Sequence, residues 1–222
     1  MSEQTKDFDI EGNDRFENDE AVKAKLHWSS VNFEYYKKKR PWSDFIADKI
    51  VQLEPKTVFE FGCNAGKNLA VISEKSPRSF VSGVDINEAA VSWGREQGLN
   101  LAVADERVLD AMPDNTFDVI FTVSVLDHLP HPEEVFRSMI RTAKCGVLLL
   151  EPWLGEEGKV VRNLNLAENK MVDTTPFSYS WDYARIGKAI APDWNLDIEP
   201  FPMSSNLGRF YKLYCFTPNC RT

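Results

Sequence analysis

The sequence predicts an α/β fold: a seven-stranded, mostly parallel, doubly wound sheet that ends in an antiparallel C-terminal hairpin. Three observations predict it. Short apolar runs alternate with helix-like segments between residues 57 and 150, a glycine-containing turn follows the first run, and two strand-like segments close the chain. Because strands that alternate with helices form right-handed βαβ units, the first five strands are expected to lie parallel in one sheet.

The N-terminal part of the chain precedes this alternation. Residues 1–20 are acidic and contain few apolar side chains, so we expect a flexible tail there. The remainder, 21–222, is predicted to be one domain, and 21–54 to be an N-terminal helical segment that Pro55 stops. Within it, residues 37–40 read KKKR, which suits either a solvated face or a contact with an anionic substrate or cofactor group.

Five strands and the helices between them are expected from residue 57 onward. The predicted strands are 57–61, 79–84, 99–103, 117–123 and 146–150. The predicted helices are 67–75, 87–97 and 132–142, with a weak helix or a loop after the third strand. The fifth strand is almost continuously apolar, as expected for a strand that is covered on both faces.

The pattern changes after Pro152. Residues 153–183 are polar and aromatic with weak periodicity, and they are too many for a plain loop, so we expect a cap or a partly helical insertion. The Asn, Tyr, Trp and Asp side chains of this segment suit either recognition of a sugar-like ligand or a small aromatic core. Segments 196–201 and 210–216 predict the antiparallel hairpin at the sheet edge.

The composition excludes several classes of protein. The chain has 222 residues, 43% of them hydrophobic, and a net charge of −8, which disfavours binding to nucleic-acid phosphates. No apolar run reaches the roughly 18 residues of a membrane span, and the acidic N-terminus does not resemble a signal peptide, so we expect a cytoplasmic protein. The four cysteines are too far apart for a zinc knuckle, so we expect free thiols and no metal site.

The turn after the first predicted strand carries the most informative motif. The sequence VFEFGCNAGKNL runs from an apolar strand through Gly62 and Gly66 into a helix. In an open parallel sheet such a turn lies at the carboxyl end of the strand, where ligands bind. Glycine allows close approach to the backbone, and the helix N-terminus offers free N–H groups. The spacing is neither GxGxxG nor GxxxxGK[ST], which disfavours a dinucleotide or a nucleoside triphosphate.

Here the sequence resembles class I S-adenosylmethionine-dependent methyltransferases, whose first motif places an acidic residue and spaced glycines after the first strand. Glu60, Gly62 and Gly66 fit this motif, and Asn64 stands where the common pattern has a middle glycine. Asparagine tolerates left-handed backbone angles, so this departure is compatible with the motif. The resemblance implies the Rossmann-like methyltransferase fold and S-adenosyl-L-methionine as the cofactor, with methyl transfer as the reaction.

Later segments fit the same family and imply further contacts with the cofactor. Asp85, at the end of the second strand, is expected to accept both ribose hydroxyls or to cap the next helix, and Ile86 to cover adenine. Asp105 is expected to receive the adenine amino group, and Thr122 and Ser124 to lie beside the methionine portion. The implied cofactor-binding residues are Glu60, Gly62, Asn64, Gly66, Asp85, Ile86, Ala104, Asp105, Thr122 and Ser124.

Few side chains offer a general base. His128 and His131 follow the fourth strand, at the rim of the expected pocket, and imidazole titrates near neutrality. His128 is the candidate catalytic residue, as a base or orienter, with pocket lining as the alternative. The neighbouring Asp127 is either an orienter of His128 or an exposed surface residue, and the second is favoured because adjacent residues of a helix or turn do not face each other. Glu151, after the fifth strand, is either a contact to a polar substrate or a cap.

The predicted function is methyl transfer to an oxygen or nitrogen of a small polar metabolite or a glycan precursor. The first motif resembles those of small-molecule and surface-glycan methyltransferases, and residues 122–125 (TVSV) lack the Asn/Asp-Pro-Pro-aromatic signature of DNA amino-methyltransferases. Two alternatives stay open: a non-catalytic S-adenosylmethionine-binding regulatory protein, and a methyltransferase that acts on RNA or protein through residues 37–40. The sequence is also compatible with a homodimer.

Overall fold

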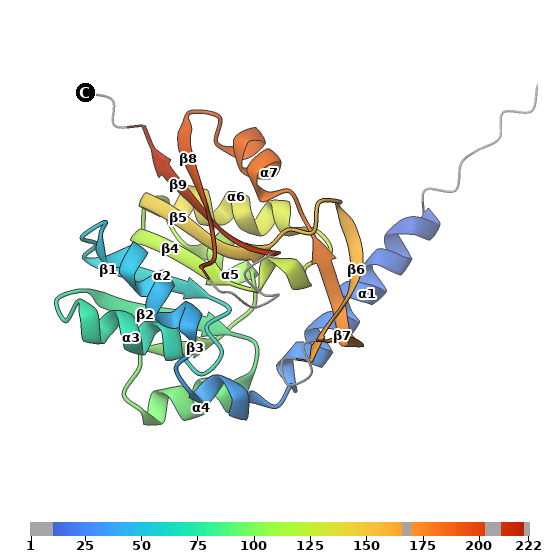
Figure 1. Cartoon of the computed structure of the whole chain (residues 1–222), viewed down its shortest axis with the longest axis horizontal. Coiled ribbons are helices and arrows are strands. Elements are labelled where there is room, and N and C mark those ends of the chain that lie inside the picture. The colour runs from blue at the N-terminus through green and yellow to red at the C-terminus, as the bar shows by residue number, and fades with distance from the viewer. Residues whose placement is uncertain (1–10, 166–169, 203–209, 220–222) are drawn as a thin grey trace, which may run out of the picture.

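A seven-stranded sheet forms the centre of the computed structural model, which describes residues 11–165, 170–202 and 210–219 (Figure 1). The strand order is β3-β2-β1-β4-β5-β9-β8. Strands β1 to β5 pair in parallel, and β9 is antiparallel to both of its neighbours, so the predicted fold class is confirmed. The strands are β1 (Thr57–Phe61), β2 (Phe80–Asp85), β3 (Leu101–Val103), β4 (Phe117–Val123), β5 (Ala143–Pro152), β8 (Trp194–Pro200) and β9 (Tyr211–Pro218).

Helices cover both faces of the sheet. They are α2 (Pro41–Val51), α3 (Lys67–Lys75), α4 (Glu88–Glu96), α5 (Arg107–Ala111), α6 (Pro132–Thr142) and α7 (Tyr183–Ile190). One core packs α2, α3 and α4 against side chains such as Leu148 and Leu150, and the other packs α5, α6 and α7 against Val147 and Leu149. Alternate residues of β5 therefore enter opposite cores, which is why this strand is apolar throughout.

Helix α7 was not expected, although the sequence carries signals for it. The side chain of Asp182 caps the helix by accepting a hydrogen bond from the backbone N–H of Arg185 at 3.0 Å. Tyr183 and Ile186, three residues apart, are buried against the sheet. Gly187 hides this pattern because it is a poor helix former, and it is needed here: a Cβ at this position would lie 2.3 Å from the ring of Phe216.

The N-terminal helix α1 (Glu11–Ser29) begins within the segment that we expected to be a tail. Residues 11–20 are therefore helical, contrary to that expectation, and residues 1–10 lie outside the described part of the chain. A short 3-10 helix, η1 (Phe33–Lys37), connects α1 to α2. Lys25 on α1 forms ion pairs with Asp105 and Glu106, which fasten the helix to the turn after β3.

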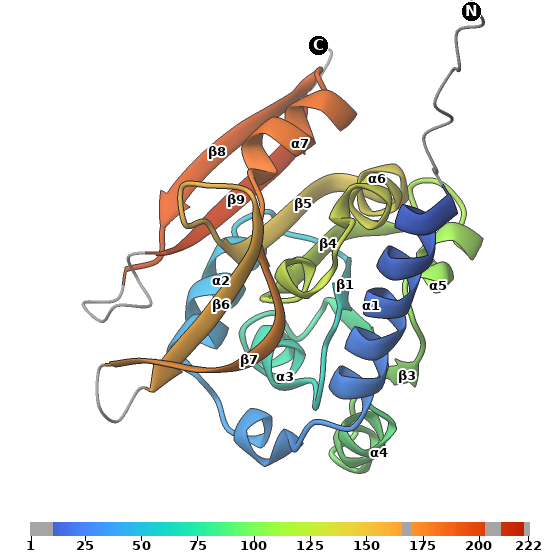
Figure 2. The ribbon, with the colours of Figure 1, turned by 90° about the vertical axis from the view of Figure 1, so that its right-hand side faces the viewer.

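The described residues between 153 and 182 contain two antiparallel strands instead of a partly helical insertion. Strands β6 (Gly158–Asn165) and β7 (Lys170–Ser180) pair only with each other among the described elements. Several β-branched residues in these segments favour strand over helix. Helix α1 contacts β7, and Figure 2 shows both in front of the main sheet. The hairpin thus acts with α1 as a cover over one end of the sheet.

The predicted C-terminal hairpin is present as the antiparallel pair β8 and β9. Its connection, residues 203–209, lies outside the described residues. Within the described ranges, no helix combines the length and the apolar composition needed to cross a membrane.

Candidate active site

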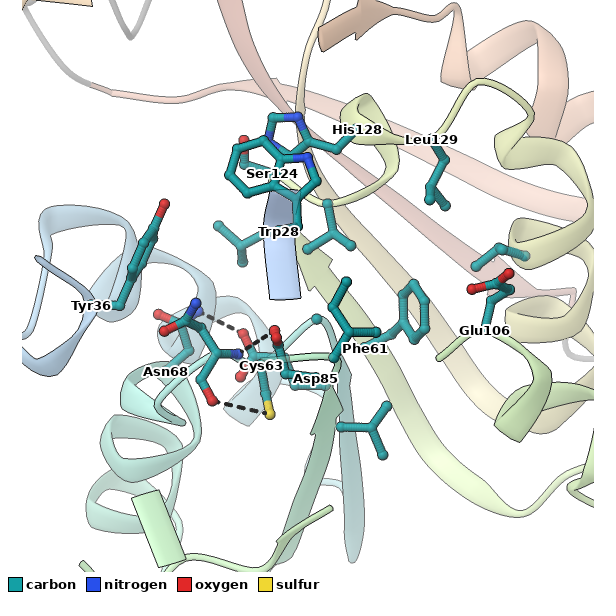
Figure 3. Close-up of a pocket in the computed structure, with 18 of the residues that line it drawn as sticks. Trp28, Tyr36, Phe61, Cys63, Asn68, Asp85, Glu106, Ser124, His128 and Leu129 are labelled. Atoms are coloured by element: carbon teal, nitrogen blue, oxygen red, sulfur yellow. Dashed lines mark hydrogen bonds between the residues drawn. The ribbon is translucent and has the colours of Figure 1, made fainter. Parts of the chain in front are cut away.

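A cavity of about 610 Å³ lies where the carboxyl ends of β1, β2 and β4 meet the N-terminal helices (Figure 3). The turns after these strands supply one wall, and α1 and η1 supply the opposite wall through residues such as Trp28 and Tyr36. All of the predicted site residues line this cavity except Gly66 and Thr122. The wall from α1 was not expected, although the aromatic residues before the KKKR stretch are a signal for it.

The two exceptions have structural explanations. Gly66, with φ +76°, precedes α3, and the side chains of Leu99 and Leu101 fill the space that a Cβ would need. Gly66 therefore has a packing role, and its contact with the cofactor stays a prediction. Thr122 is fully buried within β4, whereas the next residue, Val123, lines the cavity. Because successive side chains of a strand point to opposite faces, only one of these two can face the ligand.

The turn after β1 contains two residues with left-handed backbone conformations. Gly62 has φ +74° and Asn64 has φ +46°, so asparagine does adopt the left-handed conformation expected of it. The N–H groups of Gly62 and Cys63 both donate to the carbonyl of Val84 at 2.9 Å. A Cβ on Gly62 would lie 2.3 Å from a methyl of Val125, so glycine is required here for packing as well as for its φ angle.

Asp85 joins the turns after β1 and β2. Its Oδ2 accepts the N–H of Asn64 at 2.7 Å and its Oδ1 accepts the N–H of Asn87 at 2.8 Å. Burial raises the pKa of Asp85, and these N–H bonds oppose the rise. The cap of α4 is Asn87, whose side chain accepts from Ala90, so Asp85 does not cap that helix. Asp85 also lines the cavity, and a carboxylate oxygen can accept more than one hydrogen bond.

Glu60 presents a buried acceptor atom that the protein does not satisfy. Its side chain is 1% exposed, and its Oε1 accepts from the amide of Asn68 at 2.7 Å. Its Oε2 has no hydrogen-bond partner among the described residues. Burial raises the pKa of Glu60 well above its ordinary value. Because an unpaired buried acceptor is costly, this atom marks a place for a hydrogen-bond donor of a ligand.

The four basic residues at 37–40 divide into two pairs. Lys37 pairs with Glu34 and Lys39 with Asp44, on the surface. Lys38 and Arg40 instead line the cavity. The guanidinium of Arg40 lies 3.4 Å from the centre of the Tyr35 ring, and its buried Nε has no partner within the described part of the chain. Lys37 and Lys39 thus fit the interpretation as a solvated face, whereas contact of Lys38 and Arg40 with an anionic ligand stays a prediction.

Asp105 reaches the cavity but is already paired. Its carboxylate contacts Nζ of Lys25 at 3.4 Å and the guanidinium of Arg107 at 2.8 Å. The hydrogen bond from Arg107, which is the largest influence, lowers the pKa of Asp105 and keeps it ionised. A ligand amine that bound Asp105 would therefore share its carboxylate with Lys25 of α1.

His128 is positioned by a hydrogen bond at one ring nitrogen and by an aromatic neighbour. Its Nδ1 lies 3.0 Å from the carbonyl oxygen of Phe177, which can only accept, so Nδ1 carries the proton and the lone pair is on Nε2. The indole of Trp28 stacks on the imidazole with ring centres 3.9 Å apart (Figure 3). Burial lowers the pKa of His128 to about 4, so the ring is neutral at pH 7.

The expectation that Asp127 points away from His128 is wrong. Asp127 is fully buried, and its Oδ2 lies 3.7 Å from Nε2 of His128. The two residues belong to a single 3-10 turn, η2 (Leu126–His128), which is enclosed by β5 and β7. Both side chains therefore point into the protein. The rule that adjacent residues do not face each other describes the surface of longer helices and does not hold in this short buried turn.

Glu151 does not contact the cavity, so of its two interpretations the structure favours the cap. The side chain is fully buried, and its oxygens accept the N–H groups of Val125, Leu126 and Asp127 at 3.0, 3.3 and 3.3 Å. Burial raises the pKa of Glu151 to about 8, and the N–H bonds partly oppose that rise.

The aromatic side chains near residue 180 form a small core rather than a ligand platform. Tyr179 stacks on Trp181 with ring centres 5.6 Å apart, and the indole N–H of Trp181 donates to the carbonyl of Leu129. Tyr183 is fully buried against Tyr214. Of the described residues that line the cavity, none comes from 178–183.

The strand order, the single antiparallel strand β9 and the cavity at the carboxyl ends of β1 and β2 define a protein with the Rossmann-like methyltransferase fold. The family comparison gives the same result. The model of the family described as "Methyltransferase domain" matches residues 33–186, so the chain belongs to that family.

Curated relatives are similar over part of their length. The chain is 29% identical over 106 residues to a ubiquinone biosynthesis O-methyltransferase of Pseudomonas fluorescens (strain Pf0-1), a match that covers 45% of this chain and 44% of that protein. It is 28% identical over 99 residues to a trans-aconitate 2-methyltransferase of Mycolicibacterium gilvum (strain PYR-GCK), with 44% and 38% covered. The match thus spans less than half the length of each of these relatives.

Among solved structures, the plantazolicin methyltransferase BpumL in complex with SAH superposes with a TM-score of 0.62. The sequence identity is 14%, and the match covers 94% of this chain and 98% of that one. At this identity the likeness supports the fold alone.

Proposed function

We propose that this chain binds S-adenosyl-L-methionine and transfers its methyl group to an oxygen or nitrogen atom of a small molecule. The observation that carries the proposal is the cavity of this methyltransferase-family chain, where Glu60 and Arg40 present unpaired buried atoms of opposite character beside Asp85. These groups match a ligand that combines an ammonium, a carboxylate and a diol.

The remaining cavity residues suit the same cofactor. The carboxyl of Asp85, which lines the cavity, suits the two ribose hydroxyls, and the apolar surfaces of Ile86 and Ala104 suit the adenine ring. Glu60 Oε2 suits the ammonium of the methionine portion, and Arg40 Nε suits its carboxylate. When bound, the cofactor supplies a methyl carbon that its sulfonium has already activated.

The protein's own part in such a reaction is to align the acceptor and to remove its proton. We assign the second task to His128, whose unprotonated Nε2 follows from the bond between Nδ1 and Phe177. A proton taken up at Nε2 creates an imidazolium 3.7 Å from Oδ2 of Asp127, an arrangement that stabilises the charge in this buried place. Trp28 limits the movement of the ring by stacking on it.

The acceptor is a small polar metabolite in this proposal. The cavity walls include the rings of Trp28, Tyr36 and Tyr211, which suit a flat portion of such a molecule. The names of the two relatives point to chemically different substrates, so they do not select one acceptor. A nucleic-acid or protein substrate has less support, because Lys37 and Lys39 are paired with acids and do not add to a basic surface.

Titration calorimetry with S-adenosylmethionine and S-adenosylhomocysteine tests the first half of the proposal. Binding in the micromolar range is expected, and no heat at concentrations far above it would overturn the assignment. A screen of hydroxylated and amino metabolites with a labelled methyl donor tests the second half. Binding without transfer to any of them would favour the competing hypothesis of a non-catalytic cofactor-binding protein.

A further inference from the structure

A buried carboxyl group at the end of β5 has no role in the reaction proposed above. Glu151 lies opposite Lys212 in the pairing of β5 with β9, and the preceding residue, Leu150, pairs with Val123 of β4. The backbone at this position is therefore fixed by strands on both sides. Its side chain is fully buried and faces the turn that follows β4.

Three consecutive N–H groups of that turn converge on the two oxygens of Glu151. Oε1 accepts from Val125 and Leu126, and Oε2 accepts from Asp127. These are N–H groups at the start of η2, where a helical turn has no internal acceptors, and the side chain of Val125 provides no cap. Replacing the carboxyl group by an apolar group would leave buried donors unsatisfied, which is a costly state.

The turn held in this way delivers side chains to the cavity. Val125 packs on Gly62, Ser124 hydrogen-bonds to the hydroxyl of Tyr211 at 2.7 Å, and His128 stacks on Trp28. Ser124 has φ +52°, a left-handed conformation that a non-glycine residue adopts only when its surroundings hold it.

We infer that Glu151 is a positioning residue: from the rigid strand β5, its carboxyl group fixes the turn that seats Val125 on the Gly62 loop and places His128 in the cavity. This inference goes beyond the proposed function and does not depend on it, because it concerns the geometry of the turn before any ligand binds. A direct contact of Glu151 with a substrate is disfavoured, since its side chain does not line the cavity.

Two variants of Glu151 remove its acceptors in steps. Glu151→Gln replaces one oxygen by an amide nitrogen that cannot accept, and Glu151→Leu removes both acceptors. The matched control is Asp118, whose carboxylate accepts the N–H groups of Lys56 and Thr57 at 2.7 and 3.0 Å at the start of β4, the end of the sheet opposite the cavity. Asp118→Asn and Asp118→Leu make the same chemical changes there.

The first readout is the tautomer of His128, measured at pH 7 by long-range nitrogen–proton NMR of the ligand-free protein. The chain has three histidines, so His128→Gln assigns the signal. The native ring should be protonated at Nδ1, and the variants of Glu151 should increase the Nε2-protonated form, Leu more than Gln. The variants of Asp118 should leave the tautomer unchanged. An unchanged tautomer in both variants of Glu151 would overturn the inference.

Two further measurements separate this inference from the function proposed above. Amide hydrogen exchange of the native chain should show Val125, Leu126 and Asp127 protected. Exchange as fast as in an unstructured loop would refute the inference that Glu151 fixes these N–H groups, even if no variant folds. The affinity for S-adenosylhomocysteine should fall about three- to tenfold in Glu151→Gln and less than about twofold in Asp118→Asn. A chain that fails to bind this compound at all, yet shows the change at His128, contradicts only the proposed function.

Discussion

Replacing Gly62 by alanine tests how the turn after β1 is built. The added Cβ would lie 2.3 Å from one methyl of Val125 and 2.7 Å from the other, at a backbone φ of +74°. The left-handed conformation costs alanine about 1–2 kcal/mol, and overpacking of this kind costs a further ~1–3 kcal/mol. Val125 has little room to retreat, because its own N–H is bound to Glu151 at 3.0 Å. We therefore expect Gly62→Ala to lower the free energy of unfolding by about 2–5 kcal/mol.

Denaturation in urea, followed by tryptophan fluorescence, measures this loss, and Gly98→Ala is the matched control. Gly98 also has a positive φ, +84°, but a Cβ there would meet nothing within 4 Å, so only the backbone cost of about 1–2 kcal/mol applies. The double variant Gly62→Ala, Val125→Ala should recover part of the packing cost. Equal losses for Gly62→Ala and Gly98→Ala would refute the argument that Val125 occupies the space beside the turn.

Three further predictions concern ionisable groups of the site. Asp85→Ala should weaken S-adenosylhomocysteine binding by about 1–3 kcal/mol in calorimetry, and an unchanged affinity would remove the ribose assignment. Once an acceptor is known, His128→Ala should lower the rate roughly 10²–10⁴-fold with little change in cofactor affinity, and a near-native rate would reduce His128 to pocket lining. The pKa of Glu151 is raised from 4.5 to about 8, so between these values the folded chain holds a proton that the unfolded chain has lost. This group therefore makes stability fall as pH rises from 4.5 to about 8, by on the order of a few kcal/mol. Unfolding curves at pH 5 and pH 8 should show a smaller fall in Glu151→Gln, and an identical fall would contradict the raised pKa.

Local patterns were sufficient for the central sheet and much of the cavity wall. The predicted ranges 117–123 and 132–142 coincide with β4 and α6, because an apolar run and a proline at the first helical turn are strong local signals. Asp85 and Ser124 could be placed near one ligand because parallel strands bring their carboxyl ends to one edge of the sheet. That rule holds whatever the contacts in the rest of the molecule are.

Other features depended on contacts between segments far apart in the sequence. Stacking of Trp28 on His128, and the place of Arg40 in the cavity, follow from how α1 and η1 fold over the sheet. The hairpin of β6 and β7 has no strong local period, and its strands form by pairing with each other.

The sequence by itself determined where the strands of the central sheet lie along the chain, the left-handed turn at Asn64 and the family to which its motifs point. Only the tertiary structure decided that Asp127 faces His128 and that Glu151 accepts hydrogen bonds from the turn after β4 instead of lining the cavity. The physical reason is that side-chain direction inside a buried turn is set by the groups that must be satisfied around it, and those groups come from β5 and β7.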